Sequence, residues 1–259
     1  MDKKSLAGRR DGSSLVAVSE SADLNPKTLK PGDPRHYTSY VGPPTQFDFM
    51  GATQFSLLFA LGLRARHRVL DFGCGSLRAG RLLIPYLERG NYFGVEPNQW
   101  LLDEAITNEV GRDLIAIKEP TFDNNDQFRA DCFGVLFDFI VAQSIFSHTG
   151  PDAVVDTLRS FRSTLESDGL IVATFVEGDE DYDRGARWEY PESITYTPPT
   201  INKFATDADL AIVRTPWFHP RQTWYLMAKY PARLPTDHVL RLLHGAVLFD
   251  PDFSASIPT

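Results

Sequence analysis

The chain has 259 residues, 42% of them hydrophobic, which is enough for one domain with a sizeable buried core. Its formal net charge is −8 and its isoelectric point about 5.2. Affinity for nucleic acid depends on clustered Lys and Arg, so this charge balance argues against a nucleic-acid partner. The two cysteines, Cys74 and Cys132, are too few for a disulfide framework or a cysteine metal cluster.

No targeting or membrane-spanning segment is predicted. The polar start, Met1 to Lys4, is not followed by the apolar run of a secretory signal. The most apolar stretch, Phe55 to Leu63, is too short to cross a bilayer. We therefore expect a soluble, cytoplasmic protein with no membrane partner.

The composition divides the chain into three parts. Residues 1–35 are rich in Lys, Ser, Asp, Gly and Pro, which indicates a mobile N-terminal arm. Residues 36–230 form the main domain, and residues 231–259 form a C-terminal extension with one helix over 238–248. Within the domain, the spacing of apolar residues predicts a surface helix over 45–63, although Gly51 weakens its start.

From residue 67 onward, strands and helices alternate. We expect strands at 67–72, 92–95, 114–117, 136–142 and 170–176, and helices at 78–88, 99–110 and 152–165. This alternation indicates a parallel sheet covered on both faces. Two further strands, 210–213 and 223–229, are separated by a link too short for a helical crossover, so they should pair antiparallel.

A glycine turn follows the first of these strands. It reads Asp71-Phe72-Gly73-Cys74-Gly75 and leads into a helix. The two glycines let a ligand approach bare backbone, and the helix start offers unpaired N–H groups and a positive dipole end. Cys74, between the glycines, suits this turn as a small residue rather than as a nucleophile. The stretch therefore predicts a cofactor cradle.

Glu96 ends the second strand, 21 residues after Gly75. A carboxylate at this distance from a glycine loop is placed to accept hydrogen bonds from both hydroxyls of a ribose. The alternative is an ordinary surface Glu at a strand end. Together with the glycine turn, Glu96 favours a cofactor that contains adenosine.

The glycine spacing separates the candidate cofactors. A dinucleotide motif needs a third glycine at the sixth position, and here that position is Arg78. This weakens a nicotinamide site. No Gly-Lys-Ser or Gly-Lys-Thr follows the turn, so a P-loop is absent.

These residues resemble class I S-adenosylmethionine-dependent methyltransferases. The resemblance lies in residues 69–75, Glu96, the strand end at 137–144, the turn and strand at 168–172, and the antiparallel pair, and it covers about 66–230. It implies an α/β fold with a Rossmann-like, doubly wound, mostly parallel seven-stranded sheet and an antiparallel final hairpin. It also implies S-adenosyl-L-methionine as the cofactor. The chain departs from the family at Leu77, where a third glycine is common.

The resemblance also implies roles for individual residues. The turn with Asp71, Gly73, Cys74 and Gly75 would hold the methionine moiety of the cofactor, and Glu96 the ribose. The other implied contacts are with adenosine at Pro97, with adenine at Asp123, and with the methionine side at Gln143 and Ser144.

Arg78 has two interpretations at this stage. Its guanidinium could bind the cofactor carboxylate through two parallel hydrogen bonds. It could equally be a solvated cation on the first turn of the helix, where the dipole makes it slightly unfavourable.

Two residues are candidates for the methyl-transfer chemistry. His148 lies just beyond the fourth strand, at the edge where such sheets bind ligands, and a neutral histidine can remove a proton from a hydroxyl acceptor. It could instead order its own loop. Glu177 ends the fifth strand at the same edge as a second polar contact. The acidic run 177–183 has the composition of a solvated loop and lacks the regular spacing and the glycine of a Ca²⁺ loop; a Mg²⁺-dependent, catechol-type chemistry is the alternative.

Two segments could cover the site. Residues 36–44 precede the cradle, and Trp188, Tyr190, Tyr196 and Pro198-Pro199 follow the fifth strand, where they could form aromatic walls. Ordinary loop packing is the alternative for both. His219, next to Arg221 in the final hairpin link, is expected to be exposed.

The sequence therefore predicts a methyltransferase that acts on a small-molecule hydroxyl or amine, with O-methylation favoured and no metal. The alternatives are an NAD(P)-dependent oxidoreductase and a non-catalytic subunit that binds cofactor or partner. The acceptor and the oligomeric state are not determined by these residues.

Overall fold

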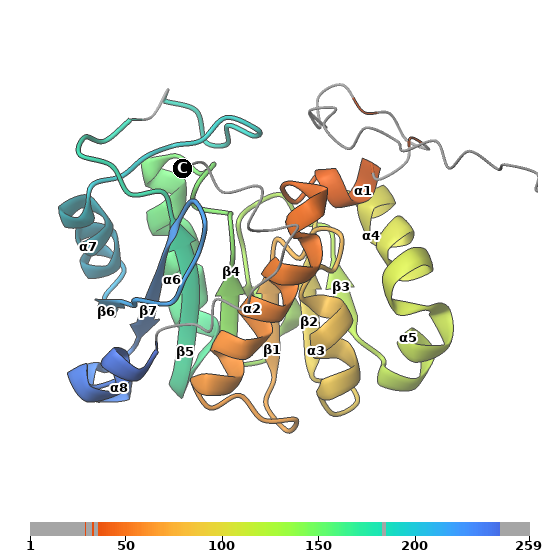
Figure 1. Ribbon diagram of the computed structural model, residues 1–259. Helices are drawn as coiled ribbons and strands as arrows, with labels where there is room; N and C mark the ends of the chain where they lie inside the picture. The colour runs from red at the N-terminus through yellow and green to blue at the C-terminus, as the bar shows by residue number, and fades with distance from the viewer. Residues whose placement is uncertain (1–28, 30–32, 34–35, 183–184, 244–259) are drawn as a thin grey trace, which may run out of the picture.

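The computed structural model describes residues 29, 33, 36–182 and 185–243. The predicted arm over residues 1–35 and the end of the predicted helix at 238–248 lie largely outside these residues. The described part contains one seven-stranded sheet in the order β3-β2-β1-β4-β5-β7-β6 (Figure 1).

The sheet is parallel except at one edge. Its strands are β1 (Val69–Phe72), β2 (Tyr92–Val95), β3 (Thr121–Asp123), β4 (Phe137–Ala142), β5 (Leu165–Phe175), β6 (Ala211–Arg214) and β7 (Thr223–Ala228). The first five pair in parallel, whereas β7 is antiparallel to both β5 and β6. This confirms the predicted α/β, Rossmann-like sheet with its antiparallel final hairpin.

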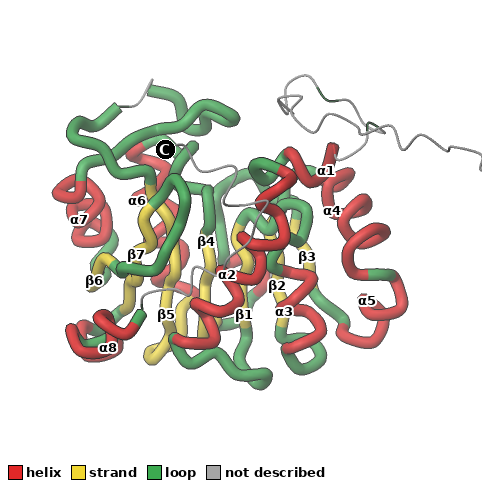
Figure 2. Tube along the Cα trace, in the orientation of Figure 1, coloured by secondary structure: helices red, strands yellow, loops and turns green. Residues whose placement is uncertain are grey.

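The helices form the other layers; Figure 2 shows them in red and the strands in yellow. They are α1 (His36–Ser39), α2 (Phe47–Ala60), α3 (Gly80–Tyr86), α4 (Gln99–Ala105), α5 (Arg112–Lys118), α6 (Pro151–Thr164), α7 (Pro198–Asp207) and α8 (Asp237–Leu242). Short 3-10 helices cover Pro44–Gln46, Asp131–Phe133 and Pro231–Arg233, and a π-helix covers Ile106–Val110.

Side chains alternate between the two faces of the sheet. Leu70, Ile140 and Ile171 belong to a core cluster shared with α6 and α7. Their neighbours Val141 and Val172 belong to a second cluster, shared with α2, α3 and α4. In Figure 1, α2 and α3 lie in front of the sheet and α6 behind it. Strands buried on both faces explain the nearly continuous apolar runs in the sequence.

One predicted strand is wrong. Residues 114–117 lie in helix α5, and the third strand follows at Thr121–Asp123. Leu114 and Ile115 pack against the cluster around α3 and α4, as one side of a helix does. A short apolar run does not distinguish a strand from a helix by its periodicity, and this one was assigned to the wrong class.

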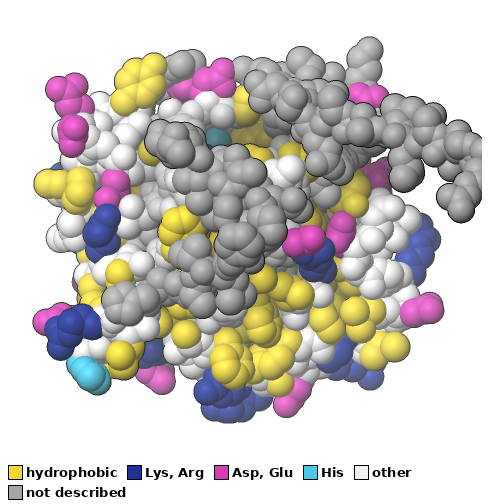
Figure 3. Space-filling view, viewed as in Figure 1, with side chains coloured by type: hydrophobic (Ala, Val, Ile, Leu, Met, Phe, Trp, Pro, Cys, Tyr) yellow, Lys and Arg dark blue, Asp and Glu magenta, His cyan; other side chains and the backbone are white. Residues whose placement is uncertain are grey.

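The surface on the α2 side carries apolar as well as charged side chains (Figure 3). Phe59, near the end of α2, is 48% exposed and meets Tyr86 edge to face. No helix among the described residues has the length and apolar character needed to cross a membrane.

Candidate functional site

A cavity of about 1330 Å³ opens at the carboxyl ends of β1, β2 and β4. Most of the predicted site residues line it: Asp71, Gly73, Cys74, Gly75, Arg78, Glu96, Pro97, Gln143, Ser144 and His148. Asp123 and Glu177 are not among its lining residues. The topology brings the first group together because parallel strands end at the same edge of the sheet.

The glycine turn depends on backbone that side chains rarely adopt. Gly73 and Gly75 have φ of +72° and +54°. A Cβ on Gly75 would lie 2.5 Å from Val41 Cγ1, and one on Gly73 only 2.0 Å from Ile145 Cδ1. Leu77 also has a left-handed φ, +54°, which explains why glycine suits this position and why Leu costs strain here.

Glu96 is held in one orientation by its neighbours. One carboxylate oxygen accepts from the backbone N–H of Gly75 at 3.1 Å, and the other accepts from the backbone and side-chain amides of Asn98 at 2.9 and 2.7 Å. Burial raises the pKa of Glu96, and these hydrogen bonds oppose the shift. The carboxylate therefore joins the turn after β1 to the end of β2, and of its about four acceptor positions one, on the oxygen bonded to Gly75, is unoccupied.

Asp71 is buried behind the turn. It accepts a hydrogen bond of 2.8 Å from the hydroxyl of Tyr92. Burial raises the pKa of Asp71 to about 6, and the Tyr92 hydrogen bond and the Arg78 charge oppose this. The neighbouring Cys74 is also buried, which raises the pKa of its thiol well above the usual value. Cys74 thus stays a neutral, small residue in the turn.

Arg78 is not a solvated cation. Only 9% of it is exposed, and it lies before α3 rather than on its surface. Its guanidinium donates to the carbonyl of Val41, whereas its Nε is buried with no hydrogen-bond partner. Burial lowers the pKa of Arg78 to about 10. No carboxylate among the described residues forms an ion pair with it, and the nearby charge of Asp71 opposes the lowering of its pKa.

His219 fixes the orientation of Gln143. Against the expectation from its loop position, His219 is only 9% exposed. Its Nδ1 accepts from the backbone N–H groups of Arg221 and Gln222, so the proton is on Nε2. That nitrogen lies 3.3 Å from the Gln143 side-chain amide, which must present its oxygen to it. The Gln143 NH₂ group then takes the buried position that has no partner.

Ser144 follows Gln143 at the end of β4. Its φ is +60°, and its backbone N–H donates to Thr174 Oγ1 at 2.8 Å. Its hydroxyl oxygen lies 2.9 Å from the side-chain amide of Gln222. Ser144 therefore links the end of β4 to β5 and to the link between β6 and β7.

His148 has one ring nitrogen engaged and the other available. Nδ1 lies 2.6 Å from the carbonyl of Glu192, to which it donates, so Nε2 carries the lone pair. Burial lowers the pKa of His148, which keeps the ring neutral. Tyr190 and Trp188 contact the ring, with centroids at 5.1 and 5.5 Å. The ordered ring of His148 thus exposes a basic nitrogen at the cavity.

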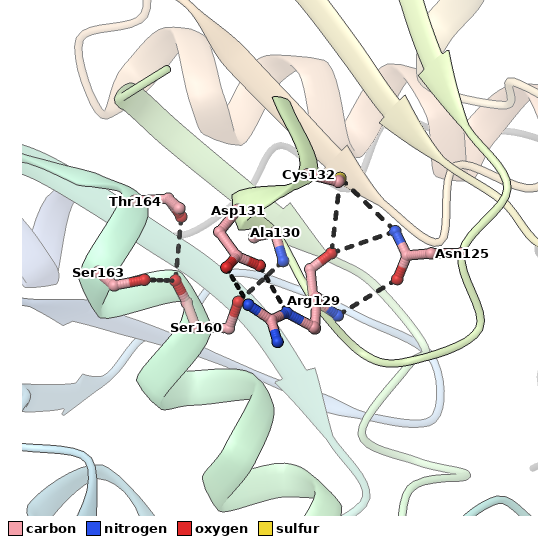
Figure 4. A network of polar contacts seen from close by, with 8 residues as sticks. All are labelled: Asn125, Arg129, Ala130, Asp131, Cys132, Ser160, Ser163 and Thr164. Carbon is pink, nitrogen blue, oxygen red and sulfur yellow. Dashed lines mark hydrogen bonds and ion pairs between the residues drawn. The ribbon is translucent and has the colours of Figure 1, made fainter. Parts of the chain in front are cut away.

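The loop after β3 is tied to α6 by a polar network (Figure 4). Asn125 contacts Arg129 and Cys132, and the backbone N–H of Ala130 donates to Ser160 Oγ at 2.8 Å. Asp123, predicted to contact adenine, accepts instead from the backbone and side chain of Asn125. The cavity-lining residues of this loop are Asn125, Asp126 and Phe128.

Glu177 is engaged away from the cavity lining. Its carboxylate pairs with Arg214 at 2.8 and 3.0 Å and accepts from the Tyr225 hydroxyl at 2.6 Å. These contacts lower its pKa. Among the described residues, no group of three or more His, Cys, Asp or Glu is arranged to hold a metal ion.

Two distant segments cover the cavity. Tyr190 donates from its hydroxyl to the carbonyl of Tyr40 at 2.7 Å, and the two rings stack at 5.2 Å. Trp188 stacks on Tyr190 at 6.3 Å, whereas Tyr196 is buried and donates to the carbonyl of Thr149. Both suggested covering segments thus contribute, with Tyr196 serving the core.

Several lining residues were not singled out from the sequence as site residues, and Phe128 and Arg221 are two of them. Phe128 has a left-handed φ of +58°, which places its ring against Trp188 and Arg187. Neither this backbone conformation nor the approach of loops far apart in the chain leaves a pattern in the sequence.

Comparison with known proteins agrees with this architecture. Residues 70–171 match the model of a methyltransferase domain family. An S-adenosylmethionine-dependent methyltransferase from Clostridium acetobutylicum ATCC 824 is similar in structure, with a TM-score of 0.53, 14% identity, and coverage of 69% of this chain and 89% of that chain. The magnesium protoporphyrin IX methyltransferase of Synechocystis PCC 6803 with bound SAM has a TM-score of 0.51 and 16% identity, with coverage of 72% of this chain and 84% of that chain.

A putative O-methyltransferase from Nostoc punctiforme PCC 73102 gives a TM-score of 0.55 at 15% identity and covers 71% of this chain and 56% of that chain. A search of curated proteins by sequence finds no match. Identities this low support the shared fold, and the family model supports the domain assignment. Residues 70–171 therefore match a methyltransferase domain family, and the chain shares its fold with S-adenosylmethionine-dependent methyltransferases.

Proposed function

We propose that this protein transfers a methyl group to a hydroxyl of a small-molecule acceptor and that the cavity at the carboxyl edge of the sheet holds both reactants. The observation that carries the proposal is the shared cavity of the glycine turn, Glu96 and the lone-pair nitrogen of His148. Its volume, about 1330 Å³, exceeds the ~300–1,000 Å³ typical of a site for one small ligand.

The lining residues suit S-adenosylmethionine, whose sulfonium supplies an electrophilic methyl group. Glu96 would accept from a ribose hydroxyl, because it lines the cavity in a fixed orientation and one acceptor position of its carboxylate is unoccupied. Arg78 would bind the cofactor carboxylate, since it lines the cavity and forms no ion pair among the described residues. Gly73 and Gly75 leave the turn bare, and Asp71 supplies a negative charge behind it.

His148 would act as the general base. A hydroxyl must lose its proton as it attacks carbon, whereas a neutral amine attacks with its own lone pair. The Glu192 carbonyl fixes the His148 tautomer, and burial keeps the ring neutral, so Nε2 can accept that proton. This is why a hydroxyl acceptor fits better than an amine. Glu177, already paired with Arg214, has no role in this proposal.

Two of the similar structures are a putative O-methyltransferase and a magnesium protoporphyrin IX methyltransferase. These names are compatible with the proposal. The net charge of −8 likewise favours a small-molecule acceptor over nucleic acid, and we retain the prediction of a cytoplasmic location.

Transfer of a tritium-labelled methyl group to a panel of phenols, alcohols and amines tests the proposal. We expect labelled product from at least one hydroxyl compound and much slower transfer by His148→Ala. Labelled amines alone would contradict the hydroxyl assignment. Cofactor binding without transfer across the panel would favour a non-catalytic subunit. Fluorescence titration with reduced nicotinamide cofactor tests the oxidoreductase alternative, which binding of that cofactor would favour.

A further inference from the structure

A second cation lies beside Arg78 at the cavity. Arg221 comes from the link between β6 and β7, lines the cavity and is exposed. A Cβ on Gly42 would lie 3.6 Å from Arg221 Nη2 and 3.7 Å from Arg78 Nη1, so both guanidinium groups flank the same glycine. Arg221 lowers the pKa of Arg78, as expected for neighbouring like charges.

The guanidinium of Arg221 is positioned without being neutralised. Its Nη1 donates to the buried side chain of Gln46 at 2.7 Å. That amide oxygen carries no charge, and no carboxylate among the described residues forms an ion pair with Arg221. One hydrogen bond leaves most of its five N–H donors free. Arg221 is thus an oriented donor group at the mouth of the cavity.

The surroundings of Arg221 contain further polar groups without partners. Of the described buried side-chain atoms that lack a hydrogen bond, three belong to cavity-lining residues: Arg78 Nε, Gln143 Oε1 and Gln222 Oε1. The tautomer of His219 turns the Gln143 amide so that its NH₂ group is the unpartnered end. His219 itself is neutral, with a pKa lowered to about 3 by burial and by both arginines, so it adds no charge to this corner.

The cofactor alone does not account for two arginines. S-adenosylmethionine has one carboxylate, one ammonium and one sulfonium, so it adds net positive charge to the cavity. Arg78 belongs to the glycine turn and lies under Val41, on the cofactor side. Arg221 lies next to Gln222, which contacts Ser144 at the end of β4. The acidic lining residues Asp71, Glu96 and Asp126 form no ion pair with Arg221 among the described residues, so Arg221 is available to an anion other than the cofactor carboxylate, and the acceptor is the molecule that can bring it.

We propose that Arg221, supported by Gln46, is an anion subsite that selects an acceptor carrying a carboxylate. This inference rests on the proposed function, because it takes the second ligand to be the methyl acceptor. A planar guanidinium binds a carboxylate through two parallel hydrogen bonds and by charge attraction. A carboxamide has the same shape but is neutral and has only one acceptor oxygen.

The test compares matched acids and amides, such as benzoate with benzamide and 3-phenylpropionate with 3-phenylpropionamide. Binding is measured by calorimetry or ligand-observed NMR on the full chain, with and without S-adenosylhomocysteine. We expect the wild type to prefer at least one acid over its amide by about tenfold or more. Arg221→Met should remove this preference, and Arg221→Lys should retain part of it.

The matched control is Arg66→Met, which removes an exposed cation outside the cavity lining. It should leave the preference for acids unchanged. The affinity for S-adenosylhomocysteine should change less than about threefold in Arg221→Met, since the cofactor carboxylate is assigned to Arg78.

Three results would overturn the proposal. The wild type could show no preference for any acid, Arg221→Met could keep the preference, or Arg221→Met could lose affinity for S-adenosylhomocysteine as strongly as for acids. The last result would place Arg221 in the cofactor site. Failure of the wild type to bind S-adenosylhomocysteine would contradict the proposed function separately, because the preference for acids is also measured on the free protein.

Discussion

The two ends of the cavity are built in different ways. The cofactor end comes mainly from one continuous stretch, residues 71–78, joined by Glu96 from the next strand. The proposed acceptor end comes from four segments far apart in the chain: 39–45, 125–128, 187–193 and 221–222. Local backbone shapes the first end, through positive φ angles and short loops, whereas contacts between loops shape the second. Cofactor chemistry is therefore encoded locally, and acceptor choice is not.

The largest expected effect concerns the base at the acceptor end. His148→Ala should lower the methyl-transfer rate by about 10²–10⁴-fold, because general base catalysis is lost. The affinity for S-adenosylhomocysteine should stay within about threefold, since His148 is not assigned to the cofactor. Single-turnover transfer and calorimetry measure the two quantities. If His148→Ala transfers the methyl group at the wild-type rate, His148 is not the base and only orders its loop.

The next effect concerns the cofactor end. Glu96→Ala should weaken binding of S-adenosylhomocysteine by about 10–100-fold, because a charged hydrogen-bond acceptor for the ribose is lost. Glu88→Ala, at an exposed position outside the cavity, is the control. Calorimetric titration of both variants with S-adenosylhomocysteine measures the effect. Equal affinities of the two variants would show that Glu96 does not bind the cofactor.

A stability measurement tests how α2 supports the glycine turn. A Cβ on Gly51 would lie 2.5 Å from the backbone oxygen of Arg78, which has little freedom to move. Gly51→Ala should therefore lower the free energy of unfolding by about 1–3 kcal/mol despite the better helix propensity of Ala. Urea unfolding beside the exposed Ser56→Ala variant measures this. A more stable Gly51→Ala protein would show that the two backbones are not in close contact.

A pH-dependent effect follows from Asp71. Its pKa is about 6 in the folded protein against an ordinary 3.8, so ionised Asp71 destabilises the fold as pH rises through 6. Asp71→Asn should be more stable than the wild type by about 1–2 kcal/mol at pH 8, and this difference should shrink as the pH approaches 4. Urea unfolding at several pH values measures it. A difference that does not vary with pH would contradict the buried, ionised carboxylate.

The smallest effect concerns the contact between the two covering segments. Tyr190→Phe removes the hydrogen bond to the Tyr40 carbonyl and keeps the ring stack. We expect a loss of about 0.5–1.5 kcal/mol in stability or a few-fold faster release of cofactor. Stopped-flow displacement of S-adenosylhomocysteine measures the release. Unchanged release and stability would mean that the segments do not hold each other.

The sequence predicted the sheet well because its signals are local. The apolar strands at β1, β2, β4 and β5 and the short link before β7 specify a mostly parallel sheet with an antiparallel edge. The strand expected at 114–117 failed, since a helix with one apolar side looks the same over four residues. Helix α7 has a Thr197 cap and two prolines at its start, although no bounds were predicted for it from the sequence.

The same distinction between local and long-range signals applies to the candidate site. Gly73, Gly75 and Glu96 were identifiable because their spacing carries their chemistry, and Leu77 marked a departure that its positive φ now explains. The burial of Arg78 and His219 was not identifiable, because it depends on Val41 and on the link between β6 and β7. Asp123 and Glu177 were chosen for their place at strand ends, and nearby side chains engage both.

Calorimetric titration of the wild-type protein with S-adenosylhomocysteine, repeated with Glu96→Ala, tests the central claim most directly. The account predicts one binding site per chain, with binding weakened by about 10–100-fold in the variant. Absence of binding to the wild type, or binding that is unaffected by loss of the Glu96 carboxylate, would contradict the assignment of the glycine-turn end of the cavity to the methyl donor.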